Sequence, residues 1–346
     1  MTTVLITGSA GLVGGECCKL FREEGWDVIA IDNFLRGKLF GKEADTAENA
    51  IILKEKYGID TINMDFADDA IAEYIEKADA IIHNASQPSH PKSVEIPLKD
   101  FTTNAAKTLL LLEKVRWHNP KIPFIFSSTN KVYGEAPNYF GYKKVGKRLE
   151  PENMMLWDGF NESLSIDACM HTPFGISKIA ADLYTQEYTR LYGLTTGVFR
   201  MGCISGGMSK ASEYQNWIPF FIKKALTGEK LYIYGYDGYQ VRDIIHASDL
   251  AELFYQFILS PQKGQVYNVG GGRQNSISLL EAIDLIEEIT GERIKYELAT
   301  ERDADHKWFI SNTNKVRNAF PSWRIRIGLK EIFIDIYKSL KGEKNE

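Results

Sequence analysis

A glycine-rich turn near the N-terminus places the tightest constraint on the fold of this chain. Gly8, Gly11 and Gly14 follow the apolar segment 3–7 and precede an amphipathic segment at 15–24. A strand, a glycine turn and a helix in this order predict a β–α–β unit, in which glycine lets the backbone approach a pyrophosphate closely. The free N–H groups and the dipole of the helix N-terminus favour an anion at the same place.

Asp32 stands at the end of the next apolar segment, 27–31. In β–α–β units that bind dinucleotides, an acidic residue at this place bonds the ribose hydroxyls and repels a 2′-phosphate. The sequence therefore predicts NAD rather than NADP, although the guanidinium of Arg36 nearby would suit a phosphate. The Gly-x-x-Gly-x-x-Gly spacing alone is a weak signal, so the interpretation depends on this context.

Strand-like and helix-like segments alternate along most of the chain. Strands are expected at 61–64, 80–83, 123–126, 196–199 and 265–269, and helices at 47–57, 70–77, 101–118, 174–191, 278–290 and 329–340. This alternation predicts an α/β fold with a doubly wound parallel sheet. We expect residues 1–201 with 236–270 to form the dinucleotide-binding domain. Residues 202–235 with 271–346 are expected to form a smaller mixed α/β domain that binds the substrate.

Composition narrows the possible partners. The net charge is −5, from 41 basic and 46 acidic residues, which is too mild to indicate nucleic acid or an anionic membrane. The apolar runs are too short to cross a bilayer, and the N-terminus lacks the pattern of a secretion signal. The four cysteines have no metal-ligand spacing. We therefore expect a cytoplasmic protein without a bound metal.

Further motifs follow at the ends of the expected strands. They are Asp65, Ser127-Ser128-Thr129, Val132-Tyr133-Gly134, the segment around Lys178 and residues 240–249. With the glycine turn and Asp32, they resemble the extended short-chain dehydrogenase/reductase family of NAD-dependent nucleotide-sugar epimerases and dehydratases, which have a Rossmann fold. The likeness covers nearly the whole chain. Thr129-Asn130-Lys131 is most similar to the CDP-tyvelose 2-epimerase branch, also called CDP-paratose 2-epimerases.

The resemblance implies adjoining sites for NAD and for a nucleotide-diphosphate sugar, with a CDP-sugar favoured. The residues implied for NAD are Gly8, Gly11, Leu12, Val13, Gly14, Asp32, Asn33, Asp65, Phe66, Asn84, Ala85, Ser86, Asn104, Ser127 and Lys178. Those implied for the substrate are Gln87, His90, Thr129, Asn130, Met201, Cys203, Trp217, Tyr234, Arg242 and Arg302. A planar guanidinium suits a diphosphate, which it can bind through two parallel hydrogen bonds.

Position 174 departs from the family pattern. The active-site segment of the family is Tyr-x-x-x-Lys, whereas Phe174 precedes Lys178 here. The resemblance implies that NAD⁺ oxidises C2 of the sugar to a ketone, that the keto-sugar rotates, and that reduction on the opposite face inverts the centre. The Tyr hydroxyl moves the alcohol proton, the Lys lowers the pKa of that hydroxyl, and Thr129 bonds the reacting oxygen. Because Phe174 lacks the hydroxyl, we expect epimerisation to be impaired.

Three explanations of Phe174 stay open. The first is an introduced Tyr-to-Phe substitution, which the intact Thr129 and Lys178 favour. The second is a natural variant in which another group moves the proton. The third is a natural protein that binds a nucleotide sugar without turning it over.

Other tyrosines near the motif are candidates under the second explanation. Tyr133, Tyr139 and Tyr142 could each supply a hydroxyl. Tyr139 and Lys143 even repeat the Tyr-x-x-x-Lys spacing, but no helical pattern surrounds them. We therefore interpret that pair as part of a surface loop.

A different enzyme activity within the same family stays open. This alternative is a UDP-hexose 4-epimerase or a 4,6-dehydratase. A dehydratase would carry Asp-Glu after Thr129, where Asn130 and Lys131 stand.

The resemblance also implies a homodimer that forms through the helices expected at 101–118 and 174–191.

Overall fold

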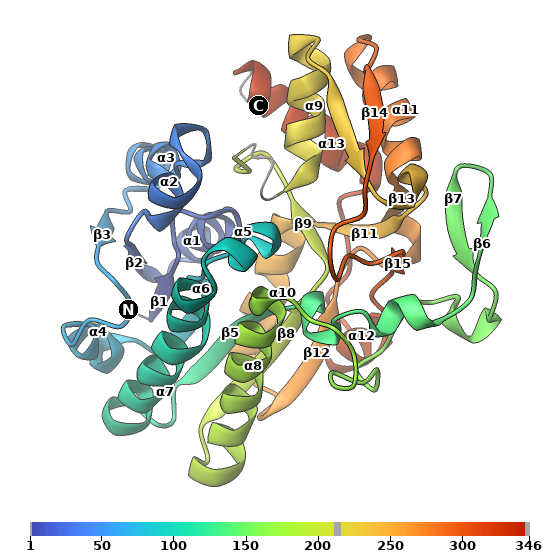
Figure 1. The fold of residues 1–346 in the computed structure, drawn as a ribbon. Coiled ribbons are helices and arrows are strands. Elements are labelled where there is room, and N and C mark those ends of the chain that lie inside the picture. The colour runs from blue at the N-terminus through green and yellow to red at the C-terminus, as the bar shows by residue number, and fades with distance from the viewer. Residues whose placement is uncertain (1, 211–215, 343–346) are drawn as a thin grey trace.

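A seven-stranded parallel sheet is the centre of the computed structural model, which describes residues 2–210 and 216–342 (Figure 1). The strand order is β3-β2-β1-β4-β5-β8-β12. The strands are β1 (Thr3–Thr7), β2 (Asp27–Asp32), β3 (Thr61–Asn63), β4 (Ala80–His83), β5 (Pro123–Thr129), β8 (Thr195–Met201) and β12 (Gln265–Val269). The order reverses between β1 and β4, and ligands of open α/β sheets bind in the crevice at such a point.

Helices cover both faces of this sheet. One face packs on α1 (Leu12–Glu23), α3 (Ala47–Tyr57), α10 (Ala247–Leu259) and α12 (Asn314–Ala319). The other packs on α4 (Ile71–Lys77), α7 (Lys107–His118) and α8 (Pro173–Tyr192). Val4 and Ile6 of β1 enter the first core and Leu5 enters the second, because successive side chains of a strand point to opposite faces. The sheet is therefore buried on both sides.

Residues after β8 build a second, smaller α/β unit with its own core. Its strands are β9 (Cys203–Ser205), β10 (Leu231–Tyr234), β11 (Val241–His246), β13 (Ser276–Ser278), β14 (Tyr296–Ala299) and β15 (Trp308–Phe309). Its helices are α9 (Trp217–Thr227), α11 (Leu279–Thr290) and α13 (Leu329–Lys341). Ile218, Ile283 and Phe333 lie in the core between these helices. In Figure 1 this unit occupies the upper right.

Shorter elements connect and flank the two units. They are α2 (Leu35–Phe40), α5 (His90–Glu95), α6 (Pro97–Phe101) and the antiparallel hairpin of β6 (Tyr142–Val145) and β7 (Arg148–Pro151). The hairpin projects from the body of the molecule in Figure 1. It includes Lys143, which the sequence analysis placed in a surface loop.

The predicted α/β fold with a doubly wound parallel sheet is confirmed. The helix expected at 101–118 differs, because a π-helical turn at Thr102–Ala106 separates α6 from α7. Among the described helices, none is both long and apolar enough to cross a bilayer.

The structure differs from the expected division at β11 and at α12, which packs with the large sheet although it lies within 271–346. Within 236–270, α10 and β12 pack with the large sheet, but β11 pairs with β9, β13 and β15 of the smaller unit. The chain therefore crosses between the units within that segment. Residues 1, 211–215 and 343–346 of the expected domains lie outside the described residues.

Candidate active site

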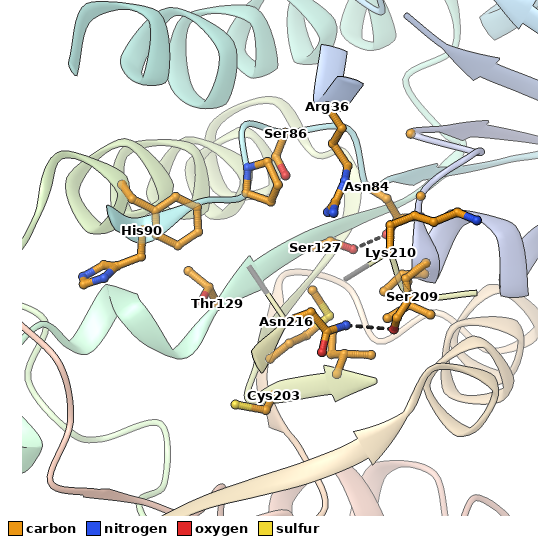
Figure 2. Close-up of a pocket in the computed structure, with 18 of the residues that line it drawn as sticks. Arg36, Asn84, Ser86, His90, Ser127, Thr129, Cys203, Ser209, Lys210 and Asn216 are labelled. Atoms are coloured by element: carbon orange, nitrogen blue, oxygen red, sulfur yellow. Dashed lines mark hydrogen bonds between the residues drawn. The ribbon is translucent and has the colours of Figure 1, made fainter. Parts of the chain in front are cut away.

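A cavity of about 470 Å³ lies where the ends of β1, β2, β4 and β5 meet the second unit (Figure 2). Its wall combines the glycine turn and α8 with β11 and the segment 301–305. Figure 2 shows Asn84 and Ser127 on one part of this wall, with Thr129 and Cys203 on another. One continuous space is thus bordered by residues predicted for the cofactor and by residues predicted for the substrate.

The glycine turn forms a tight cradle at this wall. Gly8 has φ +69°, and a Cβ on Gly14 would lie 2.1 Å from the Gly8 carbonyl oxygen. Gly11 begins α1 without a side-chain cap, so the first N–H groups of the helix keep no intrahelical acceptor. Leu12 and Val13 also line the cavity. The shape of the cradle and its free N–H groups therefore fit a pyrophosphate such as that of NAD.

Replacing Gly14 by Ala should weaken both the fold and cofactor retention. The new Cβ would overlap backbone atoms of Gly8 and Ser9, which cannot swing aside. Overpacking of this kind costs about 1–3 kcal/mol. Urea unfolding and NAD retained through purification would be measured. Gly15→Ala is the matched control, because its Cβ would meet the flexible end of Met208. Equal behaviour of the two variants would contradict this view of the cradle.

Asp32 lies at the cavity wall where β2 ends. Its carboxylate accepts hydrogen bonds from the backbone N–H of Ala10 (3.0 Å) and of Phe34 (2.8 Å), which ties β2 to the glycine turn. Arg36 lines the same region, and burial lowers its pKa to about 10. Both groups that the sequence singled out for the adenosine ribose therefore border the cavity.

Asp65 does not line the cavity, although Asn33 and Phe66 do. Its carboxylate accepts from the Asn33 side chain at 3.1 Å and forms an ion pair with Lys107. Burial acts to raise the pKa of Asp65, but the hydrogen bonds from Lys107, Ala67 and Asn33 and the Lys107 charge together outweigh burial, so the pKa is lowered. The structure thus places Asp65 behind Asn33 as a support, rather than at the wall where the sequence predicted it.

Lys178 is buried on α8 with its ammonium at the cavity. Its Nζ donates to the Ser127 carbonyl oxygen at 2.6 Å and lies 4.3 Å from the centroid of the Phe126 ring. Burial lowers the pKa of Lys178 to about 8, with Asp182 and Asp100 acting against it. The side chain is therefore fixed at the end of β5, at the wall of the cavity.

Phe174 occupies the first turn of α8, and its ring, 7% exposed, lines the cavity. Its backbone N–H donates to Ser93 Oγ at 3.1 Å. Thr129 ends β5 on the same cavity, and its Oγ accepts from the Lys131 N–H at 3.2 Å. Asn130 follows at the wall. The predicted catalytic positions are thus brought together, without a hydroxyl on residue 174.

Positive charge gathers at the part of the wall formed by the second unit. Asp305 accepts from Lys131 Nζ at 3.0 Å and from Arg242 Nη2 at 2.8 Å. Burial would raise the pKa of Asp305, but the two cations more than offset this and hold it well below its ordinary value. The Arg302 guanidinium stacks 4.0 Å from the centroid of the Tyr234 ring. Lys131, Arg242 and Arg302 carry three positive charges beside the single carboxylate of Asp305, and this net positive charge suits a diphosphate.

Arg242→Leu should weaken nucleotide-sugar binding by about 1.5–3 kcal/mol, or ~10–150-fold, because hydrogen bonds to charged groups have this strength. Calorimetric titration with CDP-glucose would measure the change. Arg317→Leu is the control, since Arg317 is exposed on α12, away from the cavity. An unchanged Kd in the Arg242 variant would remove that residue from the binding site.

Six further predicted residues also lie at the wall. They are Ala85, Ser86, His90, Met201, Cys203 and Trp217. The predicted site omits Lys131, although the Thr129-Asn130-Lys131 motif carried its signal. Lys131 is partly buried against Asp305, with 15% of its side chain exposed, so its contribution depends on a contact between residues far apart in the chain.

A model of the NAD dependent epimerase/dehydratase family matches residues 4–270. The chain belongs to this family. It is 32% identical over 337 residues to the CDP-paratose 2-epimerase of Salmonella typhi, covering 95% of this chain and 96% of that one. It is 28% identical over 331 residues to a putative UDP-glucose 4-epimerase of Methanocaldococcus jannaschii, covering 95% of each. The fold is similar to that of UDP-glucuronic acid 4-epimerase from Bacillus cereus, with TM-score 0.81, 21% identity and 99% of each chain covered.

The tyrosines considered as substitutes for the family hydroxyl are not at the cavity. The Tyr133 hydroxyl donates to the Asn268 side chain at 2.7 Å and is buried. The Tyr142 hydroxyl donates to the Pro137 carbonyl oxygen at 2.5 Å, and Tyr139 is 65% exposed. The interpretation of Tyr139 as a surface residue therefore agrees with the structure. The hypothesis that one of these three replaces the family tyrosine has no support from their positions.

Gln87 and Asn104 are also absent from the wall, because both are buried in one hydrogen-bonded network. The Gln87 amide donates to Asp100 at 2.7 Å, and the Asn104 amide donates to Ser177 Oγ at 3.1 Å. Ser177 Oγ in turn donates to Asp100 at 2.5 Å. The network joins the loop after β4 to α8. It therefore positions the wall instead of contacting the ligands, which corrects the predicted role of Gln87.

Proposed function

We propose that this chain catalyses NAD-dependent epimerisation at C2 of a CDP-hexose through a transient keto-sugar. The observation that carries the proposal is the shared cavity, in which Thr129 and Lys178 lie on a wall that also includes the glycine cradle and Arg242. The likeness to a CDP-paratose 2-epimerase supports CDP as the nucleotide and C2 as the carbon atom that is inverted. Membership of an NAD dependent family supports NAD as the cofactor.

Each part of the wall has a task in this reaction. The glycine cradle holds the pyrophosphate of NAD, Asp32 holds the adenosine ribose, and Lys178 holds the nicotinamide ribose. Arg242 and Arg302 hold the sugar-nucleotide diphosphate. When bound, NAD⁺ supplies the oxidant for the sugar carbon. Thr129 orients the reacting oxygen at the end of β5.

Phe174 makes this activity slower than that of an enzyme with a tyrosine. Its ring fills the cavity wall, but it has no group that can exchange a proton. General acid–base catalysis contributes ~10²–10⁴-fold to a rate. We therefore propose an impaired epimerase whose fold and ligand sites are intact.

A UDP-hexose 4-epimerase is the second candidate, because the chain is also similar to a putative UDP-glucose 4-epimerase. A nucleotide-sugar binding protein without activity is the third, since Phe174 alone would be enough to silence the chemistry. The three candidates differ in the nucleotide, in the carbon inverted and in whether inversion occurs at all.

One experiment separates these candidates. This chain and its Phe174→Tyr variant are incubated with CDP-glucose and with UDP-glucose, and inversion at C2 and C4 is followed by NMR. We expect inversion at C2 of the CDP-sugar alone. Inversion at C4 of the UDP-sugar would establish the second candidate. Binding without turnover in both proteins would favour the binding protein.

We also propose a homodimer formed through α6, α7 and α8. Exposed apolar side chains follow these helices, which pack together in Figure 1. They include Leu98, Phe101, Leu110, Ile176, Leu183 and Tyr184. Such a surface is typical of a protein interface.

Leu98→Arg should reduce the mass in solution from about twice 39.2 kDa to the mass of one chain, because Leu98 is 83% exposed and a dimer would bury it. Sedimentation velocity would measure this. Met155→Arg is the control, since Met155 is 89% exposed on the 3₁₀ turn Met154–Leu156. A monomer before any substitution would refute the proposed dimer.

A further inference from the structure

His90 lies beside the phenylalanine that replaces the family tyrosine. It is the first residue of α5 and lines the cavity, and its ring centroid is 6.5 Å from that of Phe174, edge to face at 84°. Figure 2 shows His90 on the same part of the wall as Thr129. The imidazole and the Phe174 ring therefore lie next to each other at the same cavity.

Ser93 fixes the position of α5 against α8. Its hydroxyl donates to the His90 carbonyl oxygen at 2.7 Å and accepts the Phe174 N–H at 3.1 Å. The Ser89 side chain caps α5 by accepting the Lys92 N–H at 3.2 Å. The His90 carbonyl oxygen is thus hydrogen-bonded, and the helix that carries His90 is capped by the preceding residue.

The Nε2 atom of His90 is buried and, among the residues that the structure describes, has no hydrogen-bond partner. A buried polar atom without a partner is costly, so it marks a place for a ligand group. The nearby His171 differs, because both of its ring nitrogens lie 3.0 Å from backbone carbonyl oxygens, of Cys169 and Val132. His90 is therefore equipped for contact with a ligand, whereas His171 has a structural role.

The charges around His90 keep its imidazole neutral in the absence of ligand. The pKa of His90 is lowered to about 3, chiefly by burial and also by the charges of Lys131, Arg302 and Arg242, while Asp305 acts against them. A neutral imidazole can accept a proton. The same three cations form the proposed diphosphate site. A bound diphosphate would offset their charge and make His90 a stronger base only when substrate is present.

We infer that His90 takes the proton of the reacting sugar hydroxyl in this chain and returns it, in place of the missing tyrosine. This inference rests on the proposed epimerase function. It selects the second of the three explanations of Phe174, in which another group moves the proton.

Atoms and electrons are conserved in this proton and hydride transfer. The hydroxyl O–H bond breaks and its proton passes to His90 Nε2, while the C–H bond breaks and NAD⁺ accepts its hydrogen with both electrons. The carbon–oxygen double bond forms, and the sugar is oxidised as NAD⁺ is reduced. The keto-sugar then rotates in the cavity. The same transfers run in reverse onto the opposite face of the sugar, and the proton returns from His90 to the oxygen.

Four full-length proteins test this step with CDP-glucose as the probe: the unchanged chain, His90→Gln, Phe174→Tyr and the double variant. We expect His90→Gln alone to lower kcat by ~10²-fold or more. In the double variant, the tyrosine should restore kcat to that of Phe174→Tyr alone, because the hydroxyl then moves the proton. His118→Gln is the matched control, since His118 bonds Glu76 at the C-terminal end of α7.

Two results of this experiment would overturn the inference. The first is that His90→Gln turns over as fast as the unchanged chain, which would point to Lys178 or another group. The second is that the double variant loses the same factor relative to Phe174→Tyr as the single variant loses, which indicates a binding or structural role. Melting temperature and bound NAD, measured for each protein, identify a variant that has failed to fold. In that case His90→Asn takes its place.

A binding experiment tests His90 independently of turnover. The ¹⁵N resonances of His90, assigned by their loss in His90→Gln, are titrated with and without CDP-glucose. We expect CDP-glucose to raise the pKa of His90 by at least one unit. An unchanged pKa in the bound protein would overturn the inference. If no protein turns over CDP-glucose but the pKa still rises, the contact at His90 is supported and the sugar in the proposed function is wrong.

Discussion

Replacing Phe174 by Tyr should raise the turnover of a CDP-hexose by up to ~10²-fold, because a positioned acid–base group contributes ~10²–10⁴-fold and the route through His90 already supplies ~10²-fold of this. The ring of Phe174 already lines the cavity, so a tyrosine ring is expected to fit the same place. Lys178 is buried on the same helix with an ammonium fixed at the end of β5, where its charge would lower the pKa of a nearby phenol. Thr129 supplies the second contact to the oxygen.

The measurement is kcat for C2 inversion in both proteins from pH 6 to 9. The variant should gain rate as pH rises through the pKa of the new hydroxyl, because the phenolate is the base. Phe140→Tyr is a matched control, since Phe140 is 37% exposed outside the cavity wall. Equal rates for the unchanged chain and Phe174→Tyr would show that the hydroxyl at this position has no catalytic role here.

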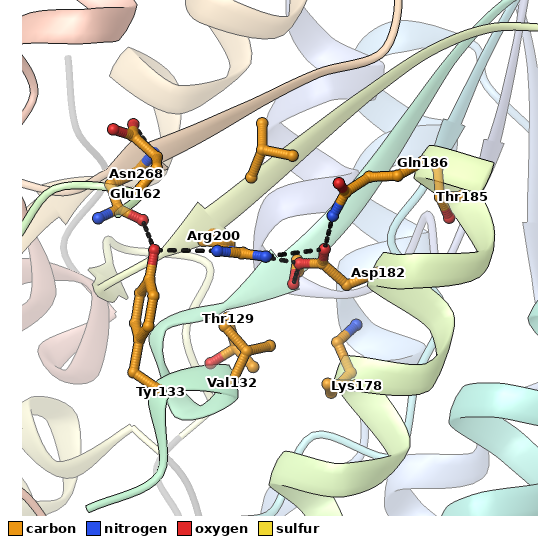
Figure 3. Close-up of polar contacts among 12 residues, drawn as sticks. Thr129, Val132, Tyr133, Glu162, Lys178, Asp182, Thr185, Gln186, Arg200 and Asn268 are labelled. Carbon is orange, nitrogen blue, oxygen red and sulfur yellow. Dashed lines mark hydrogen bonds and ion pairs between the residues drawn. The ribbon is translucent and has the colours of Figure 1, made fainter. Parts of the chain in front are cut away.

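Asp182→Ala should lower the free energy of unfolding by about 3–5 kcal/mol, because it leaves a buried guanidinium without its counter-charge. The Asp182 carboxylate accepts two hydrogen bonds from Arg200, from Nε at 2.9 Å and from Nη2 at 3.1 Å. It also accepts from the Ser128 hydroxyl at 2.7 Å and the Gln186 amide at 2.6 Å. Figure 3 shows the Arg200–Asp182 pair at the centre of this network.

The other end of Arg200 extends the network to the edge strand of the sheet. Its Nη1 donates to the Tyr133 hydroxyl at 3.2 Å, and that hydroxyl donates to Asn268 of β12. Asp182 lies one helical turn after Lys178, so the network joins β5, α8, β8 and β12 directly behind the site. Loss of Asp182 should therefore disturb Lys178 as well as stability.

Urea unfolding of both proteins would measure this loss. Glu288→Ala is the control, because Glu288 and Lys330 form an ion pair in which both side chains are more than half exposed. Exposed pairs contribute about 0–1 kcal/mol. A loss for Asp182→Ala as small as that for Glu288→Ala would contradict the structural role given to the buried pair.

Much of the fold could be predicted from local sequence. The glycine spacing, the apolar strands and Asp32 each depend on residues that are close in the chain, and the parallel sheet follows from their alternation. The positions of Gly14, Thr129 and Lys178 at one cavity follow in turn, because the carboxyl ends of parallel strands share one edge of the sheet. Helix and strand boundaries shifted by a few residues, since caps and turns fix them.

Contacts between distant segments were decided only by the tertiary structure. Gln87 and Asn104 read as ligand-binding residues in the sequence, but Asp100 and Ser177 turn their amides inward. β11 joins the smaller sheet because β9 and β13 lie next to it.

The sequence by itself determined the backbone frame, the dinucleotide cradle and the absence of a hydroxyl at position 174. The tertiary structure decided which polar side chains face the cavity and which brace it. It placed His90 beside Phe174, which is 84 residues away in the chain, and Lys131 against Asp305, which is 174 residues away, and no local pattern encodes either contact. The reason is physical: periodicity fixes which face of an element is buried, whereas a buried polar side chain takes its partner from whatever segment packs against it.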